Sequence, residues 1–166
     1  MYFEKVSFDI WKDGWQNSEV SEEQLKSWYD NIVLPKQGSK YSAGMDFFAP
    51  YSMKIPAETA IIVPTGIRWV TDVHSKDKVL MLAPRSGLGF KYGVRLSNTL
   101  GIVDADYCDA ENTGHIMIKL YNPSSEAISI MRGKAFAQGI ITQYFICQDA
   151  ECDDDRTGGF GSTDKN

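Results

Sequence analysis

Five short segments after residue 58 limit most strongly what this chain can fold into. Each is rich in β-branched and aromatic residues, and glycine, proline, asparagine and serine separate them. They cover residues 59–70, 78–84, 115–122, 127–130 and 136–146. Short strands at this spacing, with turn residues between them, are typical of a β-sandwich, a jelly roll or a barrel. The sequence therefore predicts an all-β fold.

The N-terminal stretch predicts one further strand and one helix. Residues 3–11, FEKVSFDIW, alternate between apolar and polar residues, which indicates a strand. Residues 18–33 carry acidic residues early and then apolar residues at helical spacing from Leu25 to Ile32. We therefore expect a helical insertion over about 18–33 in an otherwise β domain.

Composition and charge exclude several classes of protein. The chain has 166 residues and a formal net charge of −5, whereas a general nucleic-acid binder would need a basic face. No apolar run approaches the roughly 18 residues of a membrane span, and the N-terminus MYFEKVSFDIW lacks the apolar core of a signal peptide. Cys108, Cys147 and Cys152 are odd in number and unevenly spaced, which indicates free thiols. We expect one cytoplasmic domain that binds neither nucleic acid nor membranes and holds no zinc site.

The C-terminal end differs in composition from the rest of the chain. Residues 1–152 hold the apolar segments, whereas residues 153–166 hold acidic residues, glycines and a single aromatic ring, Phe160. We therefore predict one domain followed by a flexible arm. The ring offers a surface to a planar base. Suitable donors for phosphate oxygens in the arm are Arg156, Ser162 and Thr163.

Two loop segments carry residues suited to binding an anion. In APRSGLGFKYG, Arg85 and Ser86 stand beside Gly87 after a predicted strand. Such a turn can direct backbone N–H groups and a guanidinium at one anion. In SAGMDFFAP, Asp46 follows a glycine and precedes apolar residues. Taken singly, these segments are better explained as an ordinary surface turn and an Asx-turn, respectively.

A third segment, SNTLGIVDADYCD, combines polar groups with a short apolar run. Asn98 offers both a donor and an acceptor, as recognition of a base requires. Asp104 follows an apolar pair, so we expect it to leave a strand at a pocket, and Tyr107 lies three residues further on. A turn with a capping aspartate is the alternative.

The order of five segments resembles a known family. AGMDFFAP, PRSGL, GIVDADY, GKAFAQ and RTGGFGST, from about Ala43 to Thr163, are similar to the five ordered motifs of the trimeric dUTP pyrophosphatases (dUTPases), with a bacterial or phage member as one possibility. The resemblance implies a jelly roll or distorted β-barrel that forms a homotrimer with three active sites at subunit interfaces. It also implies that dUTP and water react to give dUMP and pyrophosphate.

The resemblance assigns the nucleoside end of the site. Asp104 matches the aspartate that orients and deprotonates the attacking water, and a carboxylate is a weak base for this purpose. Tyr107 matches the tyrosine whose ring packs on the deoxyribose. Asn98 matches the hairpin residue that pairs with uracil, with backbone near Gly101 and Val103 beside it.

The phosphate end follows from the same resemblance. Arg85, Ser86 and Gly87 match the motif that contacts the phosphate chain, and Gln138 matches a glutamine that touches phosphate or metal-bound waters. Asp46 matches the aspartate that holds waters on a Mg²⁺ ion, which the triphosphate itself mainly binds. In the arm, Phe160 would stack on uracil and Arg156 would hold the γ-phosphate. The remaining arm contacts would come from Gly161, Ser162 and Thr163.

Some positions depart from the family pattern. The fourth motif has Lys134 and Ala135 where an acidic residue and an arginine are usual, and the loop over 109–113 is longer. The helix at 18–33 lies outside the resemblance, so this helix or the loop could instead dock a protein partner in a regulatory relative. The related dCTP deaminases place a catalytic glutamate where this chain has Lys119, which argues against deamination.

Overall fold

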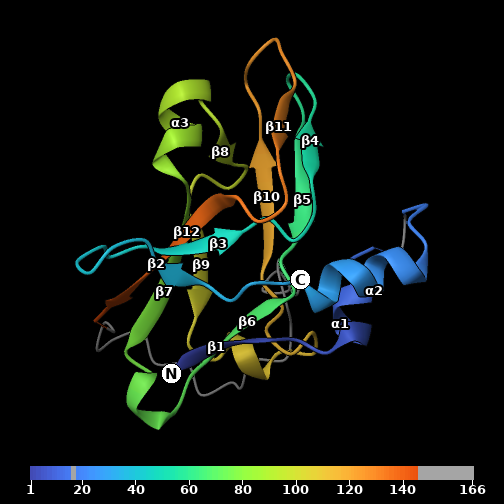
Figure 1. Ribbon diagram of the computed structural model, residues 1–166. Helices are drawn as coiled ribbons and strands as arrows, with labels where there is room; N and C mark the ends of the chain where they lie inside the picture. Colours follow the sequence, from blue (N-terminus) through green and yellow to red (C-terminus); the bar gives the residue numbers. More distant parts are fainter. Residues whose placement is uncertain (16–17, 146–166) are drawn as a thin grey trace, which may run out of the picture.

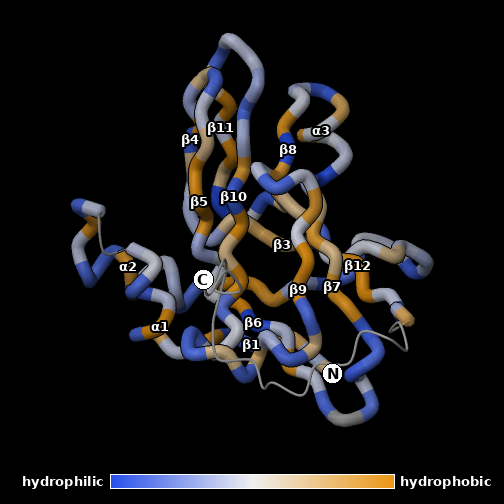
Figure 2. The backbone as a smooth tube through the Cα atoms, turned by 180° about the vertical axis from the view of Figure 1, so that it is seen from behind, coloured by the Kyte–Doolittle hydropathy of each residue, from blue (hydrophilic) through white to orange (hydrophobic). Residues whose placement is uncertain are grey.

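The computed structural model describes residues 1–15 and 18–145 of the chain. Four antiparallel sheets make up most of it, so the all-β expectation is confirmed; the jelly-roll topology stays a prediction. Hydrophobic stretches, in orange, lie along β5, β7 and β12, whereas several of the loops are hydrophilic (Figure 2). No helix in the described ranges is long and apolar enough to cross a membrane.

The largest sheet carries five of the expected site residues, which are Asp46, Gly101, Val103, Asp104 and Gln138. Its strand order is β2-β3-β12-β7-β9, with every neighbouring pair antiparallel. The strands are β2 (Lys36–Gln37), β3 (Met45–Phe48), β7 (Lys78–Pro84), β9 (Gly101–Asp104) and β12 (Ala135–Gln143).

Three smaller sheets surround this one (Figure 1). They pair β1 (Tyr2–Lys5) with β6 (Ile67–Val70), β11 (Ile128–Ile130) with β4 (Met53–Ile55), and β10 (Met117–Tyr121) with both β5 (Ala60–Pro64) and β8 (Arg95–Leu96). Short 3₁₀ turns occupy Val73–Ser75 and Tyr107–Asp109.

The N-terminal region differs in part from the expectation. Residues 3–11 do not form one strand, because β1 ends at Lys5 and α1 (Phe8–Asp13) follows. Ser7 caps α1 by accepting a hydrogen bond from the backbone N–H of Ile10. Trp11 in α1 is fully buried and donates from Nε1 to the carbonyl of Pro64 at 2.9 Å. This burial explains why the second half of the alternating segment is helical.

The helix expected at 18–33 is present as α2 (Glu22–Asp30). Ser21 caps it, and Glu22 and Glu23 lie in its first turn, where carboxylates favour the helix dipole. α1 and α2 lie together at one side of the molecule (Figure 1), and their buried Trp11 and Leu25 belong to the single hydrophobic core. These helices are therefore part of the folded domain. The predicted boundary at 152/153 lies outside the described residues.

Candidate active site

Three residues that were expected at the phosphate end of the site meet at one end of the inner strands of the large sheet. Asp46 on β3 lies directly opposite Gln138 on β12, and Gln138 in turn lies opposite Ala83 on β7. Arg85 follows the last residue of β7. Strand pairing therefore places Asp46, Gln138 and Arg85 next to one another. We call these three residues the phosphate-end cluster.

An ion pair joins two residues of the phosphate-end cluster. Arg85 Nη1 donates a hydrogen bond to Oδ1 of Asp46. The Asp46 side chain is 10% exposed and the Arg85 side chain 41%. The backbone N–H of Arg85 is also anchored, since it donates to the carbonyl of Phe136 at 3.1 Å. The guanidinium is thus held at its inner edge and open to solvent at its outer edge.

A hydrogen bond holds the Gln138 side chain, since its Nε2 donates to the carbonyl of Pro84 at 3.2 Å. A Cβ atom added to Gly44 would lie 2.4 Å from Gln138 Oε1, far closer than real Cβ contacts. A larger residue than glycine at position 44 would therefore displace this amide from its present position.

The segment at Arg85 is a helix and not the simple turn expected from its glycines. α3 covers Ser86–Tyr92, with Arg85 at the N-cap and Gly93 in a left-handed conformation at the C-cap (φ 68°). Ser86 and Gly87 are exposed in its first turn, and nothing lies within 4 Å of an added Cβ at Gly87. Both residues are thus accessible to a ligand beside Arg85.

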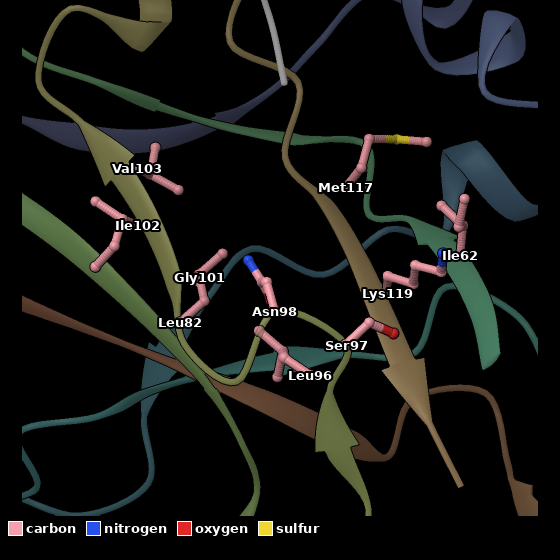
Figure 3. A pocket seen from close by; sticks show the side chains of 10 residues that line it. All are labelled: Ile62, Leu82, Leu96, Ser97, Asn98, Gly101, Ile102, Val103, Met117 and Lys119. Carbon is pink, nitrogen blue, oxygen red and sulfur yellow. The ribbon is translucent and has the colours of Figure 1, made fainter. Parts of the chain in front are cut away.

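The expected base-binding residues line a separate cavity of about 390 Å³ between β9 and β10 (Figure 3). Its lining residues are Ile62, Leu82, Leu96, Ser97, Asn98, Gly101, Ile102, Val103, Met117 and Lys119. Asn98, Gly101 and Val103 are thereby brought together. A Cβ atom on Gly101 would lie 2.9 Å from Cβ of Leu82, so the wall has room only for glycine there.

Asn98 lies in a tight turn between β8 and β9. Thr99 N–H donates to the carbonyl of Leu96 at 2.9 Å and Leu100 N–H to that of Asn98 at 2.7 Å. Thr99 has φ of 69°, the left-handed region that β-branched residues rarely adopt. The turn leaves the Asn98 side chain exposed at the cavity.

Asp104, the expected general base, lines an adjoining hollow of about 670 Å³. It is exposed at the end of β9, and Lys76, Asp106 and Tyr144 line the same hollow. Ile102 lines both the cavity and the hollow, so the two spaces adjoin. A nucleotide with its base in the cavity can extend past Ile102 toward Asp104.

Tyr107 lies mostly inside the protein. Its side chain is 3% exposed, and its hydroxyl donates to the carbonyl of His115 at 3.0 Å and accepts from Asn112 Nδ2 at 2.7 Å. The enlarged loop, through Asn112, thus holds this tyrosine in place. Only a small part of the ring could touch a sugar, and the sugar contact stays a prediction.

The buried His115 was not expected from the sequence. It is 3% exposed, and its Nε2 accepts a hydrogen bond from the backbone N–H of Gly66 at 3.0 Å. Burial lowers the pKa of His115 to about 4. The imidazole is therefore neutral near pH 7. No local pattern in the sequence signals this burial, because the residues around His115 come from a distant strand junction.

Several expectations involve residues outside the described ranges. They are Cys147, Cys152, Arg156, Phe160, Gly161, Ser162 and Thr163. In the described part of the chain, Cys108 is a free, half-buried thiol. Lys119 is exposed at the edge of the base cavity. No group of three or more His, Cys, Asp or Glu side chains within the described ranges could hold a metal ion unaided.

The phosphate-end cluster and Asp104 lie far apart within one chain. Asp46 and Asp104 are three strands apart in the order β3-β12-β7-β9, and about four residues apart along them. At about 4.8 Å per strand and about 3.3 Å per residue, their backbones are roughly 20 Å apart. A triphosphate chain is much shorter than this separation.

Comparison with known proteins gives one consistent family. A dUTPase family profile matches residues 30–164. A deoxyuridine 5'-triphosphate nucleotidohydrolase of Wolinella succinogenes is 35% identical over 147 residues, covering 86% of this chain and 93% of that protein. The enzyme of the same name from Candida glabrata is 37% identical over 150 residues, covering 86% and 94%.

Solved structures agree with these sequence relatives. The crystal structure of a dUTPase from Streptococcus mutans is 25% identical and superposes with a TM-score of 0.65, covering 89% of this chain and 98% of that chain. A mutant dUTPase from phage phi11 of S. aureus, described with a structural Mg(II) ion, is similar in fold, with 18% identity, a TM-score of 0.60, and coverage of 75% and 92%.

Proposed function

Because the chain belongs to the dUTPase family, we propose that its separated site residues act together on one dUTP molecule. The chain hydrolyses dUTP, and the reaction converts dUTP and water to dUMP and pyrophosphate. The proposal concerns the residues that perform this reaction and the assembly that brings them together.

The observation that carries the proposal is the separation of Asp104 from the phosphate-end cluster. Since roughly 20 Å divides the backbones of Asp46 and Asp104 along and across the sheet, a triphosphate chain is too short to span this distance within one chain. A ring of identical subunits overcomes this separation, because each interface can bring the phosphate-end cluster of one subunit beside Asp104 of the next. We therefore propose a homotrimer with active sites shared between subunits.

The base cavity suits uracil. Its walls are mostly apolar, and the Asn98 amide at its edge can both donate to and accept from the base. Gly101 and Val103 of β9 narrow the cavity beside Asn98. From there the sugar and α-phosphate extend past Ile102 to the hollow of Asp104.

Asp104 then acts as the general base. It accepts a proton from a water molecule whose oxygen forms a new bond to the α-phosphorus. The bond from the α-phosphorus to the bridging oxygen breaks, and pyrophosphate leaves with that electron pair. Arg85, with Ser86, Gly87 and Gln138, neutralises and orients the phosphates, so most of the acceleration comes from positioning and charge.

Mg²⁺ is the metal that fits these residues. It prefers oxygen ligands, keeps several waters and commonly binds phosphates with one or two carboxylates. Asp46 supplies one nearly buried carboxylate, whose Oδ1 is already bound to Arg85. Asp46 would therefore hold the ion through water, with the triphosphate supplying the other oxygens. When bound, the ion supplies positive charge to the phosphates.

The proposal also includes the C-terminal arm and the cellular location of the protein. The residues Arg156, Phe160, Gly161, Ser162 and Thr163 would close over the bound nucleotide, as the family motif implies. A cytoplasmic location agrees with the free thiol at Cys108.

The first test measures pyrophosphate release from dUTP, dCTP, dTTP and UTP with Mg²⁺. We expect turnover of dUTP alone, and Asp104→Asn should lose most of the rate, by about 100-fold or more, while still binding dUTP. Equal turnover of the other nucleotides would contradict the assignment of the base cavity.

A subunit-mixing experiment tests the shared site. Asp104→Asn and Arg85→Met chains, each nearly inactive alone, are unfolded together and refolded as mixed trimers. If every site takes Asp104 and Arg85 from different chains, random mixing should restore about a quarter of the sites. Failure to recover activity, with correctly assembled trimers, would contradict sharing between subunits.

A further inference from the structure

The ion pair between Asp46 and Arg85 carries an inference that rests on the proposed function. We propose that Asp46 is a positioning residue for the phosphate chain. Its carboxylate holds the Arg85 guanidinium ready for the phosphates before any metal ion binds. This role is separate from holding waters on Mg²⁺, because it acts through the arginine of the same chain.

Asp46 has a strong physical need for this partner. A carboxylate that is only 10% exposed requires a counter-charge and hydrogen-bond donors. In the described part of the chain, Arg85 is its single ion-pair partner. Lys36 lies opposite Asp46 on β2, but its ammonium lies over the ring of Phe48 at 5.4 Å.

Arg85 keeps donors available while it is bound to Asp46. The hydrogen bonds among described residues engage only Nη1 of its guanidinium, so Nε and Nη2 remain for an anion. Its backbone is anchored by the hydrogen bond to the Phe136 carbonyl. An arginine held at one edge loses less side-chain freedom on binding phosphate than a mobile one does, so pre-organisation strengthens binding, by about tenfold for one such side chain.

The direction in which anion affinity changes when Asp46 is removed distinguishes a positioning role from simple charge repulsion. Removing a negative charge beside a phosphate site should, by charge alone, strengthen the binding of an anion. If Asp46 instead orders Arg85, its removal should weaken that binding. A role confined to metal-bound waters predicts no change at all when metal is absent.

The test is therefore carried out in excess EDTA with the full-length protein. Binding of deoxyuridine and of the non-hydrolysable imido analogue of dUTP is measured by calorimetry. We expect Asp46→Ala to weaken binding of the analogue about tenfold and to leave deoxyuridine binding unchanged. Asp46→Asn, which keeps an acceptor for Arg85, should recover part of the loss.

Two comparisons complete the experiment. Glu4→Ala is the matched control, since it also removes a carboxylate paired to an arginine, Arg68, but on β1 and β6; it should not change binding of the analogue. In an Arg85→Met background, Asp46→Ala should add less than about twofold, because the residue it positions is gone.

Three outcomes would overturn the inference. The first is that Asp46→Ala binds the analogue in EDTA as tightly as the wild type or more tightly. The second is that the losses of analogue affinity caused by Asp46→Ala and Arg85→Met simply multiply in the double variant. The third is that the wild-type protein, without metal, binds the analogue no more tightly than deoxyuridine. Each of these outcomes is compatible with normal dUTP turnover in Mg²⁺. The proposed function is judged by that turnover and by the Asp104→Asn variant, so the two failures are distinguishable.

Discussion

His115 makes the stability of this protein depend on pH in a predictable way. The imidazole is 3% exposed and accepts a hydrogen bond at Nε2 from the Gly66 N–H. Only the neutral form can accept this bond, and burial lowers the pKa of His115 from 6.5 to about 4. Protonation of the imidazole therefore opposes folding.

The sign and size of the effect follow from proton linkage. Between pH 6.5 and about pH 4 the unfolded chain holds a proton on His115 that the folded chain does not. The free energy of unfolding therefore decreases as the pH is lowered through this range, by up to about 1.4 kcal/mol per pH unit. The whole range corresponds to about 3 kcal/mol. Above pH 6.5 both states are neutral at this residue, and below pH 4 both are protonated, so the contribution changes no further.

Urea unfolding at several pH values between about 4.5 and 7.5 measures this dependence. Protein concentration is kept constant, because assembly links stability to concentration. His115→Gln keeps an acceptor near Gly66 but cannot titrate, so its stability should vary much less over this range. Hydrogen bonds also lower the pKa of Asp72 and Asp77 below the ordinary 3.8. These carboxylates therefore lose their stabilising contribution mainly at pH values below the measured range.

His74→Gln is the matched control for this experiment. His74 is exposed, so its replacement should leave the wild-type pH dependence intact. A His115→Gln variant that loses stability with falling pH as steeply as the wild type would refute the assignment to His115.

Three further changes test the packing and buried hydrogen bonds of the domain. Tyr107→Phe removes the acceptor of Asn112 and should lower the free energy of unfolding by about 1–2 kcal/mol in urea; an unchanged value would show that water replaces the hydroxyl. Asn122→Ala should cost about 2–4 kcal/mol, because this fully buried amide donates to three backbone carbonyls; a loss below about 1 kcal/mol would contradict this. Gly101→Ala brings a Cβ within 2.9 Å of Leu82 Cβ and should weaken deoxyuridine binding by about tenfold in calorimetry; equal affinity would show that the wall can move.

Much of the secondary structure was predictable because it depends on local sequence. The segment 78–84 coincides with β7, and 115–122 contains β10. Alternating and β-branched residues favour extended backbone irrespective of their partners. α2 was also predictable, since its cap at Ser21 and its acidic first turn lie within the helix sequence itself.

The segment 3–11 shows where local pattern is insufficient. Its alternation is compatible with a strand throughout, yet the chain becomes helical at Phe8. The decisive contact is the burial of Trp11 against the Pro64 carbonyl, 53 residues away in the sequence. Tertiary packing overrode the local preference there.

The candidate site residues were likewise chosen from the sequence, by the order of five short motifs. Their arrangement was not. Asp46 and Arg85 meet although 39 residues separate them, whereas Asp104 is held roughly 20 Å from Asp46. The register of β3, β12, β7 and β9 decides both facts.

The sequence by itself thus determined the β class, the motif residues and the chemistry they can perform. Only the tertiary structure decided that Arg85 is held by Asp46, that Tyr107 and His115 are buried, and that Asp104 lies roughly 20 Å from Asp46. The physical reason is that backbone preference and side-chain chemistry are local properties, whereas proximity and burial depend on strand pairing between distant segments.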